Sequence, residues 1–251
     1  MYVSIDDTRH VATIEIRRGP NNFFDLATLS EVADSLDKLA GGDVRAVVLC
    51  SEGKNFCAGM NFTTPDEGVA SSGATHLYDI AIRFFEQPLP IVAAVQGAAI
   101  GGGLGLALAA DLRVASRESR FGANFARLGF HHGFGLTVTL PLVVGHQAAV
   151  ELLYTGRRID GEAASHIGLC DHLVDAGQIR PRAIELAEEI AVSAPLALRS
   201  IRATMRGPLV ESVRAALAHE RAEQDRLRRT DDFREGVQAM SERRGPRFVG
   251  R

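Results

Sequence analysis

Three consecutive glycines, Gly101, Gly102 and Gly103, stand between an apolar run and a stretch of small residues. The apolar run, residues 91–95, contains three β-branched residues and predicts a strand buried on both faces. Residues 104–110 are compatible with a helix. Glycines let the backbone turn sharply and approach a ligand closely. The free N–H groups and positive dipole end of the helix's first turn would point back at them, so the pattern predicts a site for negative charge.

Two further groups could do chemistry. Lys54 follows an expected strand and is one of only two lysines among 28 basic residues, which indicates either a phosphate contact or a solvated loop charge. His131 and His132 are adjacent in a glycine-flanked loop. One of them could serve as acid, base or donor to a substrate, or both could make ordinary loop or interface hydrogen bonds. Because neighbouring side chains of an extended chain point in opposite directions, we expect the two imidazoles not to face one metal or one substrate atom.

Three other interpretations of the glycine-rich stretch compete with a binding site. A transmembrane helix is disfavoured because five glycines and Gln96 interrupt the stretch, and no basic flank or aromatic belt follows it. A dinucleotide-binding fingerprint fails on its spacing, because the third glycine would fall at Leu106 or Leu108. A packing turn without a ligand stays open, since close packing of a strand on a helix also selects small residues.

Composition limits the class of protein. The chain has 251 residues, of which 46% are hydrophobic, which suffices for a sizeable core in one large or two small domains. The net charge of −3 means that the chain has no overall positive charge to attract a polyanion, so no nucleic-acid partner is expected. Three cysteines without paired spacing indicate a reducing compartment and neither a disulfide scaffold nor a zinc site. The first residues lack a basic region followed by an apolar stretch, so a cytoplasmic location and no membrane association are expected.

The elements that must position these groups alternate between strands and helices. Two short strands are expected within residues 3–16, and Asp25 can cap the helix that follows them. Residues 44–50 and 112–115 predict further buried strands. The order of two strands, a helix and a strand, followed by the strand and helix around the glycines, predicts an α/β layer fold with mostly parallel sheets.

From residue 137 onward the pattern is helical. Residues 176–251 contain fifteen arginines and eleven acidic residues, which indicates arginine-laced helices on a surface or subunit interface and not a second catalytic domain. Asp232 and Glu235 have the spacing of a capping pair that would open the last helix. The expected helices are residues 148–154, 161–167, 179–192, 196–205, 209–229 and 232–243.

Several motifs occur in a fixed order along the chain. They are Phe56-Cys-Ala-Gly-Met60, Ile91-Val-Ala-Ala-Val-Gln-Gly97, Gly101-Gly-Gly-Leu-Gly-Leu-Ala107, Asp111-Leu-Arg-Val114, Phe121-Gly122, Leu128-Gly129, Gly133-Phe-Gly135, Thr155-Gly-Arg-Arg-Ile159, Ala164-Ser-His-Ile-Gly-Leu169 and Thr230-Asp-Asp-Phe-Arg-Glu-Gly236 with Phe248. In this order and spacing the sequence resembles the crotonase superfamily, also called the enoyl-CoA hydratase/isomerase family, over essentially its whole length. Ordered motifs at family spacing are far more specific than any one of them alone.

The resemblance implies a crotonase-like α/β fold, with a spiral of ββα units in residues 1–190. Residues 191–251 would form a helical C-terminal region that makes homotrimers, commonly paired as a dimer of trimers. The implied ligand is an acyl-CoA thioester, so coenzyme A enters as part of the substrate and no permanently bound cofactor is expected. The thioester carbonyl would lie in an oxyanion hole whose donors map to the backbone N–H groups of Met60 and Gly102.

The resemblance also assigns the coenzyme A portion of the ligand. The backbone of Ala58 maps to recognition of the adenine. Lys54 maps near the phosphates of coenzyme A, and Arg244 or Arg247 from the C-terminal tail maps there more loosely.

The sequence departs from the family at both catalytic acids. Family hydratases carry a glutamate two residues after the glycine triplet and another four residues after the Phe-Gly phenylalanine, where this chain has Gly105 and Phe125. Neither residue can transfer a proton. Adding water to an enoyl thioester requires a base for the water and an acid at the α-carbon, so ordinary hydratase activity is not expected, and the assignment as a double-bond isomerase is weakened too.

Other superfamily members place catalytic residues elsewhere, including in the loop that holds the two histidines. His131 or His132 could therefore supply the proton-transfer group. Asp66, Glu67 and Asp79 are more distant candidates, and Asp111 matches a structural aspartate of the family.

Two hypotheses follow, and a third remains. The first is an enzyme of acyl-CoA metabolism that stabilises a thioester enolate and uses a histidine in place of the missing acids. The second is a non-catalytic acyl-CoA carrier or sequestering protein with the same fold. An unrelated α/β enzyme with fortuitous glycine loops is the third. The sequence leaves the acyl chain length open.

Overall fold

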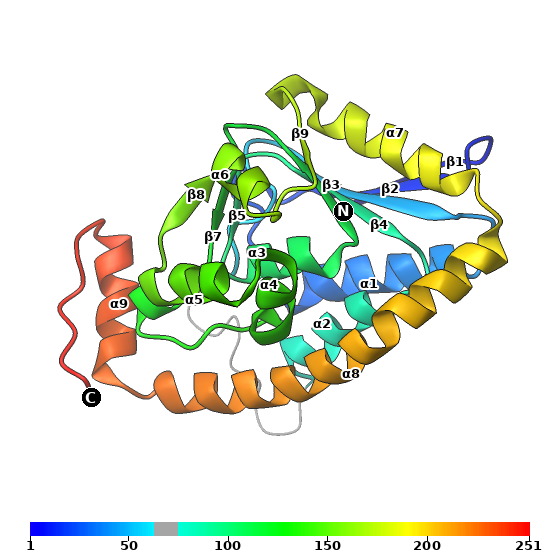
Figure 1. Ribbon diagram of the computed structural model, residues 1–251. Coiled ribbons are helices and arrows are strands. Elements are labelled where there is room, and N and C mark those ends of the chain that lie inside the picture. Colours follow the sequence, from blue (N-terminus) through cyan, green and yellow to red (C-terminus); the bar gives the residue numbers. More distant parts are fainter. Residues whose placement is uncertain (63–74) are drawn as a thin grey trace.

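The computed structural model describes residues 1–62 and 75–251 as a layered arrangement of sheets and helices (Figure 1). Its strands are β1 Tyr2–Asp6, β2 Val11–Ile16, β3 Ala46–Ser51, β4 Ile91–Val95, β5 Ala98–Ile100, β6 Leu112–Ala115, β7 Arg120–Gly122, β8 Arg158–Asp160 and β9 His172–Leu173. Its helices are α1 Leu26–Ala40, α2 Leu77–Glu86, α3 Gly102–Ala109, α4 Leu136–Val144, α5 His146–Thr155, α6 Gly161–His166, α7 Ile179–Ala191, α8 Pro195–Leu227 and α9 Asp231–Ser241, with short 3-10 turns at Ala126–Leu128 and Ala176–Gln178. Among the described residues, no helix is long and apolar enough to cross a membrane.

The main sheet has the strand order β1-β2-β3-β4-β6-β9. β1 and β2 form an antiparallel hairpin, and every later neighbour pairs in parallel. The expected hairpin and mostly parallel α/β sheet are therefore confirmed. The predicted strands at residues 91–95 and 112–115 are also confirmed as β4 and β6.

Helices cover both faces of the main sheet. Figure 1 shows α7 along one face and α1 and α2 on the other, with α8 running past them. The residues of β3 alternate between these two cores: Val47 and Leu49 lie in the larger core, while Val48 and Cys50 pack with residues of α7 in the smaller one. Burial on both faces explains why β3 reads as an uninterrupted apolar run.

A second, smaller sheet continues from the first and leads into the glycine turn. It has the order β5-β7-β8, with β5 parallel to β7. Of the three glycines, only Gly101 has a positive φ, of 58°, whereas Gly102 and Gly103 already belong to α3. The prediction that all three form the turn and that the helix starts at residue 104 is therefore wrong. Gly103 is needed for close approach, because a Cβ there would overlap the carbonyl oxygen of Cys57.

The C-terminal region differs from the expectation in two respects. Residues 196–205 and 209–229, predicted as two helices, form the single helix α8 with Pro208 inside it. Pro208 is exposed, so water can satisfy the carbonyl group that loses its partner. Arg202 and Arg206 both pair with Asp111, at 3.1 Å and 2.8 Å, and anchor the half of α8 that precedes the proline. Helix α9 begins one residue early, because its N-cap is Thr230 and not Asp232.

Candidate active site

A cavity of about 720 Å³ opens where the loop after β3 meets the start of α3. Its wall contains the predicted residues Met60 and Gly102, together with Ala58 and Lys54. The structure therefore brings four of the eight predicted site residues to one cavity. His131, His132, Arg244 and Arg247 are not among the described residues that line it.

The two glycine loops are joined by backbone hydrogen bonds. The Cys57 N–H donates to the Ala98 carbonyl at 2.9 Å, and the Ile100 N–H donates to the Cys57 carbonyl at 3.0 Å. A Cβ at Gly59, where φ is +88°, would lie 2.8 Å from the Ile100 carbonyl oxygen and 3.6 Å from the Gly102 nitrogen. Only glycine fits this conformation and this close approach. The backbone just before Met60 therefore lies directly against the first residue of α3.

Two backbone donors are left free at this junction. Among the described residues, the N–H groups of Met60 and Gly102 donate to no acceptor. Gly102 is the first residue of α3, so its free N–H points out of the positive end of the helix. A carbonyl oxygen that gains negative charge is the kind of group that such donors stabilise.

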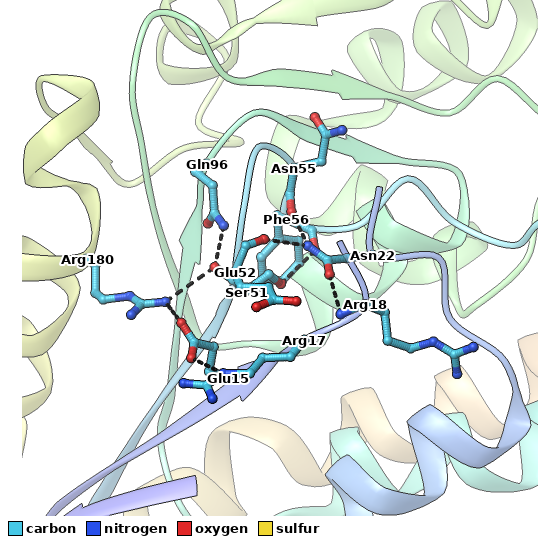
Figure 2. A network of polar contacts seen from close by, with 10 residues as sticks. All are labelled: Glu15, Arg17, Arg18, Asn22, Ser51, Glu52, Asn55, Phe56, Gln96 and Arg180. Atoms are coloured by element: carbon cyan, nitrogen blue, oxygen red, sulfur yellow. Dashed lines mark hydrogen bonds and ion pairs between the residues drawn. The ribbon is translucent and has the colours of Figure 1, made fainter. Parts of the chain in front are cut away.

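A polar network holds the first of these loops from behind (Figure 2). The buried Asn22 side chain donates to the carbonyl oxygens of Glu52, at 2.8 Å, and Asn55, at 2.6 Å. Gln96 donates to the Ser51 carbonyl at 2.6 Å, and the Ser51 hydroxyl donates to the Phe56 carbonyl at 2.7 Å. These bonds fix the chain just before Ala58. In Figure 2 the same network continues to the ion pairs between Glu15 and its two arginines, Arg17 and Arg180.

Aromatic rings fill the two positions where the sequence lacks an acid. A Cβ at Gly105 would lie 2.5 Å from the Cβ of Phe134, so the Phe134 ring occupies that space. Phe125 is 8% exposed and lines the cavity. The Phe24 ring lies over Gly102 and 5.7 Å from the Phe134 ring. The wall next to the free N–H groups is therefore mostly aromatic, with the Asn124 amide near Gly101, and Glu118, at the exposed rim, is the only carboxylate among its described residues.

The loop that carries Phe134 is held by one face of α8. Phe134 has a positive φ of 61°, which is strained for a residue with a side chain. The buried carboxylate of Glu220 accepts hydrogen bonds from the N–H groups of Gly135, at 2.8 Å, and Thr137, at 3.0 Å, and from the Thr137 hydroxyl, at 2.7 Å. Burial raises the pKa of Glu220, and these hydrogen bonds oppose that rise. One turn later, Gln224 donates to the His131 carbonyl at 2.9 Å.

The two histidines lie against α8. Their rings stack with centroids 4.1 Å apart, so the prediction that they point in opposite directions is wrong. That prediction assumed an extended chain, whereas residues 129–135 form a loop between a 3-10 turn and α4. His132 Nε2 donates to the Thr137 hydroxyl at 2.9 Å, and that hydroxyl donates to Glu220. Burial lowers the pKa of His132 to about 4, and the charges of His131 and His219 contribute.

Two polar side chains from the first turn of α2 do line the cavity. His76 Nδ1 accepts the backbone N–H of Tyr78 at 3.1 Å, so the neutral imidazole carries its proton on Nε2. Burial lowers the pKa of His76, and the charge of Arg221 adds to this. The Tyr78 hydroxyl donates to Gln224 Oε1 at 2.9 Å, and burial raises its pKa. The sequence analysis missed His76, Tyr78 and Gln224, because only the folding of α2 against α8 brings them together.

The other acidic candidates have separate outcomes. Asp79 accepts the backbone N–H of His76 at 2.7 Å and completes the N-terminal cap of α2. Asp66 and Glu67 lie outside the described residues. Asp111 accepts the Ile91 N–H at 2.7 Å and pairs with two arginines of α8, which is a structural role.

Cationic side chains gather at the exposed mouth of the cavity. Lys54 is joined there by Arg120, Arg158 and Arg243, which the sequence analysis did not single out. The tail arginines that it did single out are engaged elsewhere: Arg244 pairs with Glu235 and Glu242, and the Arg247 N–H donates to Glu235 at 2.7 Å. Within the described part of the chain, no three histidine, cysteine or acidic residues are grouped to hold a metal ion.

Comparison with known proteins gives a consistent result. The family model described as Enoyl-CoA hydratase/isomerase matches residues 6–251. The (E)-benzylidenesuccinyl-CoA hydratase of Thauera aromatica is 31% identical over 258 residues, which cover 100% of both chains. The crystal structure of an enoyl-CoA hydratase/isomerase from Pseudoalteromonas atlantica superposes with a TM-score of 0.90 at 29% identity, over 99% of both chains. The structure of an enoyl-CoA hydratase from Bacillus anthracis gives a TM-score of 0.75 at 32% identity, again over 99% of both chains.

Proposed function

The chain belongs to the enoyl-CoA hydratase/isomerase family, with the crotonase fold that its sequence predicts, and we propose that its cavity binds an acyl-CoA thioester. The thioester carbonyl oxygen would accept hydrogen bonds from the backbone N–H groups of Met60 and Gly102. The observation that carries this proposal is the pair of free donors on two backbone segments that lie against each other. Removing one such donor from an enzyme typically costs about 3 kcal/mol of barrier, so this pair could stabilise a thioester enolate substantially.

The exposed cations at the mouth of the cavity can bind the coenzyme A portion of the ligand. The cations Lys54, Arg120, Arg158 and Arg243 are exposed and can meet the phosphates of coenzyme A. The half-buried Ala58 lines the same cavity, and its backbone would contact the adenine. The Arg244 guanidinium would join this group only by leaving Glu235, whereas Arg247 is held to Glu235 by its backbone N–H.

As an enzyme, the protein would act on the carbon next to the thioester carbonyl without the usual glutamate pair. Among the described residues, Gly105, Phe125 and Phe134 leave no carboxylate beside the free donors. We propose that His131 or His132 supplies the proton-transfer group through movement of their loop. The alternative is a non-catalytic acyl-CoA carrier, which the apolar wall beside the donors favours.

A direct experiment tests whether the protein has enoyl-CoA hydratase activity. The purified protein is incubated with a short-, a medium- and a long-chain 2-enoyl-CoA, and gain of water is followed by mass spectrometry beside a glutamate-bearing hydratase. We expect the thioesters to be retained and water to be added far more slowly than by the control. Hydration at the rate of the control would refute the inference drawn from Gly105 and Phe125. Failure of every CoA thioester to bind would refute the proposed function itself.

A double variant separates the enzyme from the carrier. Replacing His131 and His132 by glutamine should abolish turnover of any thioester that the wild-type protein converts, while leaving acyl-CoA affinity unchanged. Unchanged turnover would remove both histidines from the mechanism. Absence of turnover in the wild-type protein, with tight binding, would favour the carrier.

We further propose that residues 191–251 form the oligomerisation region of a homotrimer or a dimer of trimers. Apolar side chains near the start of α8 and beside it are exposed, among them Val192 (82%), Leu196 (80%) and Met205 (75%). Exposed apolar groups of this size are typical of a subunit interface. Light scattering after size-exclusion chromatography would give three or six times the mass of one chain.

The three cysteines are free and buried, which suits the cytoplasmic location that the sequence predicts.

A further inference from the structure

One arginine in the cavity wall has no counterion among the described residues. Arg228 follows the last residue of α8 and lines the cavity. Its guanidinium forms no ion pair with any residue that the structure describes. Its guanidinium carbon lies 5.0 Å from the centre of the Phe130 ring. Burial lowers the pKa of Arg228, and Tyr78 and the charge of Asp225 oppose this only in part.

Other buried arginines of the protein are neutralised. Arg113 pairs with Asp171 at 2.6 Å, and Arg202 and Arg206 share Asp111. An arginine keeps its charge at all physiological pH values, and taking that charge out of water without a partner is unfavourable. The half-buried Arg228 has no such partner among the described residues, and it differs from other half-buried arginines in lining the cavity. Its position is the one expected of a group that meets a charged ligand.

A second donor lines the same cavity as Arg228. His76 also lines the cavity, and the charge of Arg228 contributes to lowering its pKa. Its Nδ1 accepts a backbone hydrogen bond, so its Nε2–H remains available as a donor. Tyr78, whose ring centre is 5.0 Å from that of His76, has its hydroxyl fixed on Gln224. Arg228 and His76 therefore both present donors to this cavity, while the hydrogen bond between Tyr78 and Gln224 holds the wall in place.

This pair lies on the acyl side of the cavity and away from the cationic mouth. A Cβ at Gly133 would overlap the Tyr78 hydroxyl, and the next residue, Phe134, covers Gly105. Gly105 is in the first turn of the helix that Gly102 opens. The contacts thus lead from the proposed carbonyl site through Phe134 to the side chains around Arg228. The mouth, in contrast, is formed by exposed residues of β7, β8 and the loop after β3.

We propose that Arg228 and His76 form an anion subsite, and that the acyl group of the thioester ligand carries a second carboxylate at its far end. This inference rests on the proposed function, because it needs the thioester carbonyl at Met60 and Gly102. A planar carboxylate can accept two parallel hydrogen bonds from the guanidinium and a third from the imidazole. The ligand class is therefore an acyl-CoA derived from a dicarboxylic acid.

Matched pairs of thioesters test the subsite. Binding of glutaryl-, adipyl- and suberyl-CoA is measured by calorimetry against pentanoyl-, hexanoyl- and octanoyl-CoA, with free coenzyme A as reference. We expect the wild-type protein to prefer the carboxylated member by about 10- to 100-fold at one chain length or more, the range for a hydrogen bond to a charged group. Arg228→Met keeps the apolar stem over Phe130 and should abolish the preference. Arg228→Lys should retain part of it.

Arg229→Met is the control variant, because Arg229 is exposed and does not line the cavity. It should keep the full preference. Thermal unfolding and affinity for free coenzyme A show that each variant is folded. Equal binding of both members of every pair by the wild-type protein would overturn the anion subsite and leave the proposed function intact. An equal loss of affinity for free coenzyme A and all thioesters in Arg228→Met would place Arg228 on the coenzyme A portion and would also overturn it. Failure of every thioester to bind would instead refute the proposed function.

Discussion

The most direct test of the missing acid is a methyl group at Gly105. In Gly105→Ala the new Cβ would lie 2.5, 2.8 and 2.9 Å from the Cβ, Cγ and Cδ1 atoms of Phe134. These atoms are at the base of a ring that is 1% exposed, so they cannot swing away as the end of a flexible side chain could. The backbone of the loop or of α3 must therefore shift.

The expected loss of stability combines two opposing effects. Overpacking of a close-packed core costs about 1–3 kcal/mol. Replacing glycine by alanine within a helix returns about 0.5–1 kcal/mol, because the unfolded chain loses freedom. We expect Gly105→Ala to lower the free energy of unfolding by about 0.5–2 kcal/mol. Gly177→Ala is the control: nothing lies within 4 Å of a Cβ there, and its φ is ordinary. That variant should raise stability by about 0.4–1 kcal/mol.

A double-mutant cycle identifies the colliding residue. Phe134→Gly removes all three contact atoms, and glycine adopts the φ of 61° without strain. The variants are compared by urea unfolding at one fixed protein concentration, because an oligomer's stability depends on concentration. In the Phe134→Gly background, Gly105→Ala should become neutral or stabilising, which gives a coupling energy of about 1–3 kcal/mol. An equal effect in both backgrounds, or a stabilising effect in the wild-type protein, would refute the argument that the Phe134 ring occupies the site of the missing acid.

Three further substitutions test other parts of the structure. Asp111→Asn leaves two buried arginines of α8 without a counterion and should cost about 3–5 kcal/mol in urea unfolding, whereas Asp231→Asn at the exposed start of α9 should cost under about 1 kcal/mol. Burial raises the pKa of Glu220, so its contribution to stability is full below the unfolded-state pKa and is lost as pH rises through the folded-state pKa. Glu220→Gln should remove this pH dependence of the free energy of unfolding and cost about 1–2 kcal/mol, because one hydrogen-bond acceptor is lost. His132 has its pKa lowered to about 4, so stability should fall as pH drops from about 6.5 towards that value. His132→Gln should flatten that fall, while His146→Gln, on the exposed surface, should leave it unchanged.

The strands and the central turn were predictable because their signals are local. Residues 91–95 are a short apolar run and residues 112–115 are apolar apart from Arg113, and they form β4 and β6 with those bounds. The glycine triplet was recognised, but the separate structural role of each glycine was not. Whether a glycine serves positive φ or close approach depends on the neighbouring segment, and the carbonyl oxygen that excludes a Cβ at Gly103 belongs to Cys57, far away in the sequence.

Contacts between distant segments account for what the sequence did not show. Pro208 predicts a helix break, yet α8 continues through it because Arg202 and Arg206 are anchored to Asp111, which is 91 positions before Arg202. The hydrogen bond between Tyr78 and Gln224 joins positions 146 apart. No spacing rule relates such positions, so the polar wall of the cavity could be found only after α2 and α8 were placed together.

The same loop carries the histidines on one side and the apolar wall on the other, which constrains how either can be tested. The Glu220 carboxylate accepts hydrogen bonds from the Thr137 hydroxyl and from the N–H of Gly135, the residue after Phe134. His132 in turn donates to the Thr137 hydroxyl. A change at His132 can therefore reach the cavity by shifting Phe134, without any contact between the imidazole and a substrate. A loss of turnover in a histidine variant would indicate proton transfer only if acyl-CoA affinity and the Gly105–Phe134 coupling stay at their wild-type values. If that coupling falls as well, the histidines position the wall and the proton-transfer group must be sought elsewhere in the cavity.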